Sequence, residues 1–246
     1  MDKVVVSAAG RGTRMLHLTD DKPKHLIKVN GKPFLFYVLN NLSMAGYKEV
    51  VLVTGYKNEL VEEFLKDYKF NGLKVSCLNQ YDEFNPAEKY GTACPLMLKE
   101  IKSFVGKEQF LYICGDNFYS VDDLKSMNVS DGYNYVAGQE NEHPENFGVI
   151  LTEGEFLKEI AEKPKDFLGN VVNTSLYKFT PEIFKKILEI KKSSRGEYEI
   201  TDAVSLLVKD KKVKVEMIKD FWMDFGRPED IKTLSKILKN EGNKRK

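Results

Sequence analysis

The sequence has few cysteines and no long apolar run, and each absence excludes a class of protein. Its three cysteines are isolated, with no Cys-x-x-Cys pair, which argues against a disulfide-bonded secreted scaffold and a structural zinc site. No apolar stretch approaches the roughly 20 residues that a membrane-spanning helix needs, and the apolar stretch near the N-terminus is too short for a signal peptide. We therefore expect a cytoplasmic protein with reduced thiols and no membrane partner.

An excess of charge of one sign is also lacking. The 246 residues include 38 Lys and Arg against 37 Asp and Glu, which gives a formal net charge of +1. Because a balanced surface is not typical of proteins that coat nucleic acid, we expect no nucleic-acid partner. His17, His25 and His143 lack the spacing of metal ligands, and we interpret them as structural or surface residues.

Apolar runs alternate with amphipathic segments over the first half of the chain. Continuous apolar runs such as 50–54 are typical of strands buried on both faces of a sheet. The alternation predicts a three-layer α/β/α fold with a Rossmann-like, mostly parallel mixed sheet. The predicted strands are 4–8, 50–54, 73–78 and 110–114, and the predicted helices are 33–45, 58–66 and 92–103.

After about residue 133 the predicted strands lie closer together, with little helix between them. They cover 133–138, 147–151, 156–160, 171–179, 213–218 and 221–223, and the predicted helices are 181–190, 200–208 and 228–238. A chain of this length with 42% hydrophobic residues can form one sizeable core. We predict a single domain over 1–246, with one half over about 1–130 and another over about 131–246, and we expect the two halves to share one sheet.

The first strand leads directly into a glycine-rich loop. Residues 10–14 read Gly-Arg-Gly-Thr-Arg, and Lys24 lies shortly after them. The third glycine of the dinucleotide fingerprint is absent, as is the Walker run G-x-x-x-x-G-K-[ST], and Gly-x-Gly alone also fits an ordinary turn. However, glycines after a buried strand bring backbone N–H groups close to phosphates, and Arg14 and Lys24 supply positive charge. The whole pattern predicts a loop that binds nucleotide phosphates.

Two aspartates are candidate metal ligands. Asp116 follows the predicted strand 110–114 after one glycine, and ligands of open α/β sheets bind at the carboxyl ends of strands. A capping or turn role for Asp116 is the alternative. Asp224 begins the triplet Asp-Phe-Gly, which also occurs in kinases, but the V-A-I-K lysine and the H-R-D loop of kinases are absent.

Residues 8–15 and 22–33 resemble the signature of the sugar-1-phosphate nucleotidylyltransferases, also called nucleotide-sugar pyrophosphorylases. The likeness is greatest to glucose-1-phosphate thymidylyltransferases and UTP–glucose-1-phosphate uridylyltransferases. It implies that Asp116 and Asp224 hold a catalytic Mg²⁺ and that Gln80 reads a pyrimidine edge, although the loop 81–90 is longer than usual. The nucleotide-binding residues that it implies are Ala8, Ala9, Gly10, Gly12, Thr13, Gln80, Gly91 and Thr92.

The same resemblance covers the second half of the chain and implies a site for a sugar phosphate. Its residues are Gly148, Glu162, Asn173, Tyr177 and Arg195, together with the Lys163 ammonium. A solvated turn is the alternative for Lys163, and a charge before a helix is the alternative for Arg195. Ser175 stands where the family has a glycine that lets ligand and backbone approach closely, so the identity of the sugar is open.

The activity implied by the resemblance is transfer of a nucleotidyl group from dTTP or UTP to glucose 1-phosphate, with release of pyrophosphate. In that reaction Arg14 stabilises the departing pyrophosphate, Lys24 contacts the α-phosphate, and Lys163 holds the attacking phosphate. The implied partners are these small molecules, in a monomer or a homo-oligomer. Because no β-helix extension follows the last helix, we expect one activity only.

Two alternatives stay open from the sequence. A non-catalytic regulatory relative of the same fold would lack some of Arg14, Lys24, Asp116 and Asp224, yet all four are present. The second alternative is an enzyme with another base or acceptor, such as GTP with mannose 1-phosphate or heptose 1-phosphate, or CTP with phosphocholine.

Overall fold

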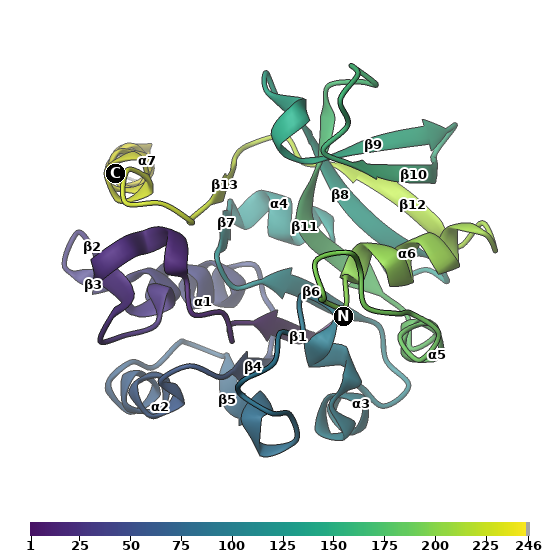
Figure 1. The fold of residues 1–246 in the computed structure, drawn as a ribbon. Helices are drawn as coiled ribbons and strands as arrows, with labels where there is room; N and C mark the ends of the chain where they lie inside the picture. The colour runs from purple at the N-terminus through teal and green to yellow at the C-terminus, as the bar shows by residue number, and fades with distance from the viewer. Residues whose placement is uncertain (245–246) are drawn as a thin grey trace.

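A nine-stranded mixed sheet runs through the protein, whose computed structural model describes residues 1–244 (Figure 1). The strand order is β5-β4-β1-β6-β11-β8-β12-β10-β9. The first four of these strands are parallel, and β11 is the first antiparallel strand, paired with β6 and β8. The bounds are β1 Lys3–Ser7, β4 Glu49–Thr54, β5 Lys74–Asn79, β6 Phe110–Cys114, β8 Asn134–Glu140, β9 Gly148–Glu153, β10 Phe156–Glu162, β11 Val171–Phe179 and β12 Val213–Met217.

Helices cover both faces of this sheet, as predicted. In β1, Val4 and Val6 face one hydrophobic core and Val5 faces the other, which explains why the strand is apolar at every position. The first core includes residues of α1 (Phe34–Met44), α2 (Asn58–Asp67), α4 (Val121–Ser126) and α7 (Asp230–Lys244). The second includes residues of α3 (Lys99–Val105), α5 (Ile183–Lys186) and α6 (Ile200–Val208). The fold is therefore a three-layer α/β/α arrangement.

Two predicted helices are shorter than expected. The prediction of a helix over 92–103 is wrong in its first part, where Cys94–Met97 form the 3-10 turn η4 and Leu98 is extended before α3 begins. Pro95 accounts for this, because proline has no N–H to donate and restricts the residue before it. Likewise, the predicted helix over 181–190 is regular only over α5.

Two small sheets lie outside the main one. In one of them β7 (Asn117–Tyr119) pairs with β13 (Trp222–Asp224), and in the other β2 (Lys28–Val29) pairs with β3 (Lys32–Pro33). The segment predicted over 221–223 thus pairs with β7, while β12 joins the main sheet beside β8. The remaining short turns are 3-10 helices: η1 Thr13–Thr19, η2 Lys24–Leu26, η3 Gln80–Asp82 and η5 Pro144–Asn146.

The described helices do not have the length and composition of membrane-spanning segments. Between residues 1 and 244, none is both long enough and apolar enough to cross a membrane.

Candidate active site

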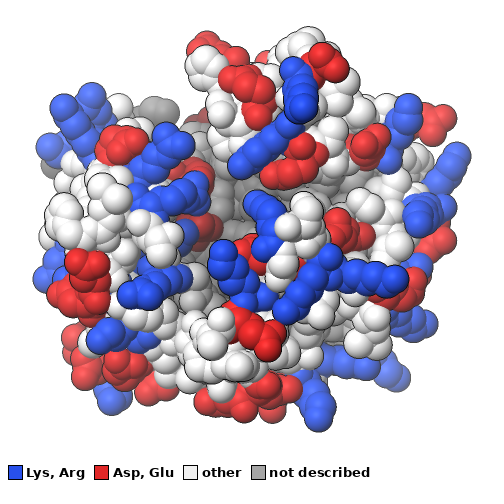
Figure 2. Space-filling view, in the orientation of Figure 1, with Lys and Arg blue, Asp and Glu red and all other residues white. Residues whose placement is uncertain are grey.

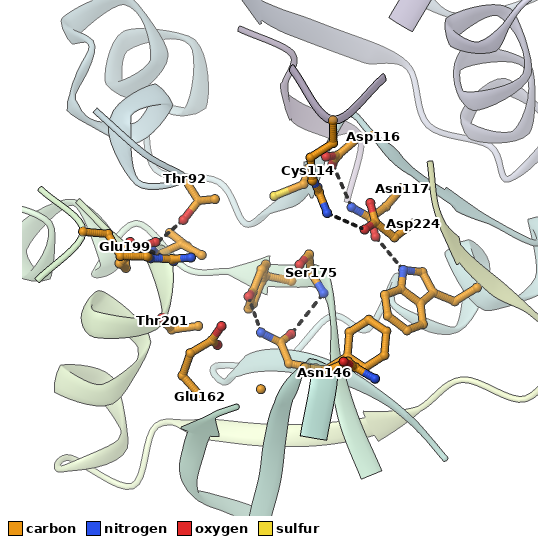
Figure 3. Close-up of a pocket in the computed structure, with 18 residues that line it drawn as sticks. Thr92, Cys114, Asp116, Asn117, Asn146, Glu162, Ser175, Glu199, Thr201 and Asp224 are labelled. Carbon is orange, nitrogen blue, oxygen red and sulfur yellow. Dashed lines mark hydrogen bonds and ion pairs between the residues drawn. The ribbon is translucent and has the colours of Figure 1, made fainter. Parts of the chain in front are cut away.

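Two neighbouring cavities open where β1 and β6 end. The larger, of about 450 Å³, lies under residues 9–13 and is called the loop cavity. The smaller, of about 230 Å³, lies over residues of β9, β10 and β11 and is called the strand cavity (Figure 3). Both are lined by Thr92, Cys114 and Asp116, so they meet at the carboxyl end of β6. Lys and Arg side chains gather around a hollow on this face of the molecule (Figure 2).

The glycine-rich loop forms one wall of the loop cavity. A Cβ atom at Gly12, whose φ is +74°, would lie 2.8 Å from Cβ of Lys24, so only glycine lets the two segments approach this closely. Four residues predicted to bind nucleotide line the cavity here: Ala9, Gly10, Gly12 and Thr13. Ala8 does not line it, and instead its N–H donates a hydrogen bond to the Val53 carbonyl (2.7 Å), which ties the loop to β4.

Lys24 and Asp116 form an ion pair at the junction of the two cavities. Only 8% of Lys24 is exposed. Burial alone would raise the pKa of Asp116, but the charge and hydrogen bond of Lys24 outweigh that effect and lower it. The neighbouring His25 is buried, and this burial lowers its pKa to about 3. Its imidazole is therefore neutral near pH 7, in keeping with a structural role.

The second carboxylate reaches Asp116 through the pairing of β13 with β7, which places Asp224 opposite Asn117. The Phe225 N–H then donates to the Asp116 carbonyl (2.7 Å). Figure 3 shows the side chains of Asp116, Asn117 and Asp224 close together. Burial, and then the charge of Asp116, raises the pKa of Asp224 to about 6. Two mutually repelling carboxylates at one place indicate a site for a cation.

The segment before β13 is anchored by Asp123 of α4. Its carboxylate is buried and accepts hydrogen bonds from the backbone N–H groups of Lys219 (2.8 Å), Asp220 (3.2 Å) and Phe221 (3.2 Å). In addition, the Trp222 Nε1–H donates to the Asn117 side-chain oxygen (2.6 Å). These contacts fix the strand that carries Asp224.

The donor chemistry of the carboxylate pair fits Mg²⁺. This ion prefers oxygen ligands and is bound through one or two protein carboxylates, with phosphate oxygens and waters completing its shell. Over residues 1–244 there is no cluster of three or more His, Cys, Asp or Glu side chains arranged for a metal. An ion held by Asp116 and Asp224 would therefore need ligands from a bound substrate, as magnesium sites in phosphoryl-transfer proteins do.

The far wall of the loop cavity holds the residues predicted to meet the base. Gln80, Gly91 and Thr92 all line it. A Cβ atom at Gly91, whose φ is +74°, would lie 2.6 Å from the carbonyl oxygen of Tyr198. Thr92 accepts a hydrogen bond from the N–H of Ile200 (3.0 Å), the first residue of α6. The wall of the loop cavity is thus joined to the helix that borders the strand cavity.

Side chains on β10 and β11, together with Gly148, form the strand cavity. Five predicted sugar-phosphate residues meet there: Gly148, Glu162, Asn173, Tyr177 and Arg195. Asn173 Nδ2 donates to Tyr177 Oη (2.7 Å), and its side-chain oxygen accepts from the Ser175 N–H (3.0 Å). Ser175 has a φ of +60°, a left-handed conformation that is unfavourable for serine and easy for glycine. The serine therefore occupies a backbone position suited to the glycine of the resembled motif.

The predicted cations are distributed unevenly. Arg195 lines the strand cavity, and its guanidinium is held by the buried Glu199 (Nη2–Oε1 2.9 Å). Arg14 also lines the strand cavity, where its Nη1 lies 3.8 Å from Asp224 Oδ2. Lys163, an exposed residue of the described chain, lines neither cavity.

Some lining residues were not predicted. In the strand cavity they include Glu199, Asn146 and Trp222, and in the loop cavity they include Arg11 and Tyr81. Glu199 could have been found, because its spacing of four residues from Arg195 is one at which opposite charges often pair. For Asn146 and Tyr81 the sequence contains no comparable signal, since both lie in three-residue 3-10 turns that have no apolar periodicity.

The sequence is similar to known proteins over nearly its whole length. Residues 3–241 match the nucleotidyl transferase family. The protein AglF of Haloferax volcanii, named as a UTP–glucose-1-phosphate uridylyltransferase, is 33% identical over 247 residues, which cover 97% of each chain. The bifunctional protein GlmU of Methanocaldococcus jannaschii is 34% identical over 245 residues. The match covers 99% of this chain but only 55% of that relative, so the chain spans about half of its length.

Solved structures show the same fold. A UDP-glucose pyrophosphorylase complexed with UDP-glucose superposes with a TM-score of 0.80 and 24% identity, over 98% of this chain and 99% of the other. A structure described as a putative glucose-1-phosphate thymidylyltransferase from Bacillus anthracis superposes with a TM-score of 0.79 and 24% identity. The match covers 96% of this chain and 95% of the other. The family match and the curated relatives together confirm the family predicted from the sequence. The chain belongs to the nucleotidyl transferase family.

Proposed function

We propose that this protein transfers a nucleotidyl group from UTP or dTTP to glucose 1-phosphate, forming a nucleotide sugar and releasing pyrophosphate. The observation that carries this proposal is the junction of two cavities at Asp116, where one cavity has a glycine-rich loop and the other has polar side chains. A reaction between two bound anions requires two adjoining sites with positive charge between them. The names of AglF and of the UDP-glucose pyrophosphorylase favour uridine and glucose.

The nucleotide is assigned to the loop cavity. Backbone N–H groups of residues 9–13 would face its phosphates, and Lys24 would contact the α-phosphate. The sugar phosphate is assigned to the strand cavity, where Glu162 and Asn173 offer hydrogen bonds to hydroxyl groups. Arg14 borders the junction beside Asp224 and is assigned to the departing pyrophosphate.

The chemical step needs little from the protein besides alignment and charge. A phosphate oxygen of the sugar phosphate attacks the α-phosphorus in line, and pyrophosphate leaves. Because that phosphate is already ionised near pH 7, no general base is needed. Arg195, held by Glu199, and Lys163 at the end of β10 are assigned to the attacking phosphate. Lys163 would have to turn inward, since it is exposed without substrate.

A divalent cation is the proposed cofactor. Asp116 and Asp224 would hold Mg²⁺, whose chemical contribution is to neutralise charge on the reacting phosphates. Without it, Lys24 is the cation paired with Asp116. Lys24 thereby keeps the Asp116 carboxylate ionised and ready to bind an ion.

The proposal is tested by a substrate panel. Five nucleoside triphosphates are each combined with several sugar 1-phosphates and with phosphocholine, with and without Mg²⁺, and pyrophosphate release is measured. We expect turnover with UTP or dTTP and glucose 1-phosphate, dependent on the metal. Lys163→Ala should lose about a hundredfold in rate while folding normally. Absence of turnover in every combination would contradict the proposed activity, and wild-type turnover in Lys163→Ala would remove that residue from it.

A further inference from the structure

The loop cavity contains a polar contact that the proposed reaction does not use. Gln80 begins η3 at the end of β5 and lines the cavity, with only 8% of its surface exposed. The fully buried Cys94 begins η4 behind it. The Cys94 thiol donates a hydrogen bond to the side-chain oxygen of Gln80, with an Sγ–Oε1 distance of 3.3 Å. A buried cysteine therefore contacts the one amide assigned to the base.

The thiol is the donor in this contact. Burial raises the pKa of the Cys94 thiol to about 12, so the thiol carries its proton and acts as a donor. A protonated thiol matches the amide oxygen better than the amide NH₂ group, which is also a donor. The Gln80 side chain is thereby held with its oxygen toward the protein interior.

The other end of the amide faces the cavity. The Cys94 thiol lies on the buried side of the Gln80 amide, and the NH₂ group is on the other branch of that amide from the oxygen. Tyr81 lines the same cavity as Gln80. The oxygen is engaged by Cys94 and the nitrogen is directed to the cavity side, so the group offered to a base is an N–H donor.

We infer that Cys94 is a positioning residue that sets base selectivity: it holds the Gln80 amide so that the cavity favours a base with a carbonyl at position 4 over one with an exocyclic amine there. Uracil and thymine present an acceptor at this position, whereas cytosine presents an NH₂ donor. Two donors facing one another would leave both unpaired in a buried site, which is the situation that gives strong discrimination. This inference rests on the proposed function, because it assumes that the base lies in the loop cavity.

The test measures kcat/KM with UTP and with CTP in three variants of the full chain and compares the ratio of the two values, called the UTP:CTP ratio. Cys94→Ala removes the donor and frees the amide to turn over, so we expect the UTP:CTP ratio of kcat/KM to fall by about tenfold or more. Cys94→Ser keeps an O–H donor and should retain most of the ratio. Gln80→Glu offers only acceptors to the cavity and should shift the ratio further toward CTP. Cys77→Ala is the matched control, because its thiol lies on β5 beside Thr54 and Asn58, outside both cavities.

Direct binding separates this inference from the proposed function. UTP and CTP binding is measured by calorimetry alongside turnover, and thermal melting checks that each variant folds. If the wild type binds UTP more tightly than CTP and Cys94→Ala loses that preference, the inference holds even when no pyrophosphate is released. An unchanged UTP:CTP ratio in folded Cys94→Ala would overturn it, as would a wild type that prefers CTP. If Cys94→Ala weakens UTP binding and CTP binding by the same factor, Cys94 only supports the cavity wall, and that result also overturns the inference.

Discussion

The two cavities are built in different ways, although they share Asp116. The loop cavity depends on backbone, because Gly12 and Gly91 have positive φ angles and a Cβ at either would collide with a neighbouring segment. The strand cavity depends on side chains that project from β10 and β11, such as Glu162, Asn173 and Tyr177. A phosphate chain is the same in every nucleotide and suits a backbone cradle, whereas sugars differ in their hydroxyl groups. We therefore expect that substitutions in the strand cavity change which acceptor is bound more readily than substitutions in the loop cavity change the binding of the nucleotide phosphates.

The largest effect is expected where the cavities meet. In Asp224→Asn one of the two carboxylates assigned to the metal is lost, and removal of one such electrostatic contact costs on the order of 3 kcal/mol, or about a hundredfold in kcat. The fold should not be weakened, because the variant removes both the burial of a charged carboxylate and its repulsion with Asp116, the two effects that raise the pKa of Asp224. Steady-state kinetics and thermal melting check this, with the exposed Asp122→Asn as the control. Full activity in Asp224→Asn would separate this carboxylate from the reaction.

A second prediction tests the dependence of the loop cavity on backbone. Gly91→Ala must adopt a left-handed φ, which costs about 1 kcal/mol, and must also displace the Tyr198 carbonyl, which adds about 1–3 kcal/mol. Gly72 has a similar φ of +68° with open space around it, so Gly72→Ala should lower the free energy of unfolding only by the cost of the left-handed φ, about 1 kcal/mol. Urea unfolding measures both losses, and the KM for UTP should rise in Gly91→Ala alone. Equal losses in the two variants would show that the close approach to Tyr198 is unimportant.

Acid should weaken the protein through the wall of the loop cavity. His25 has a pKa of about 3 when folded and an ordinary value near 6.5 when unfolded, so the unfolded chain binds a proton that the native protein excludes. The stabilisation is therefore complete above about pH 6.5 and is lost as pH falls toward 3, by about 2 kcal/mol between pH 7 and pH 5. The strand cavity has no histidine among its described lining residues.

The measurement compares the free energy of unfolding of the wild type with that of His25→Phe at pH 7 and pH 5. Other groups titrate equally in both proteins, so the difference isolates His25. We expect the wild type to lose about 2 kcal/mol more than the variant over this range. Parallel pH profiles would show that His25 is protonated in the native protein.

The smallest effect is expected at the floor of the strand cavity. Ser175→Gly relieves the left-handed backbone, but the added freedom of the unfolded chain offsets the gain, so stability should change by less than about 0.5 kcal/mol. Losing the hydroxymethyl group enlarges the cavity. The ratio of kcat/KM for N-acetylglucosamine 1-phosphate over glucose 1-phosphate should rise by about threefold to tenfold, with KM for UTP unchanged. A change in KM for UTP alone would contradict the assignment of the two cavities.

Much of the fold could be predicted because its strands are buried on both faces. Residues 50–54 and 171–179 are strongly apolar or alternating, and they correspond to β4 (Glu49–Thr54) and β11 (Val171–Phe179). The prediction of one helix over 92–103 was wrong because it followed the apolar periodicity of the segment and neglected Pro95, which interrupts a regular helix. The meeting of Asp116 with Asp224 came from family resemblance, since no local pattern shows that β13 pairs with β7.

The remaining site residues depend on loops and on bound substrate. Lys163 was selected from a motif, and its exposed position shows that a motif identifies a residue without giving its conformation before substrate binds. Glu199 was missed although its spacing from Arg195 was informative. Magnesium, the cytoplasmic location and the individual residue roles stay predictions.

The short pairing of β13 with β7 brings a carboxylate from near the end of the sequence to the junction of the two cavities. The glycine-rich loop, Lys24 and Asp116 belong to the first half of the sequence, whereas Asp224 follows all nine strands of the main sheet. Under the proposed function, capture of the nucleotide and its turnover therefore depend on different stretches of the polypeptide.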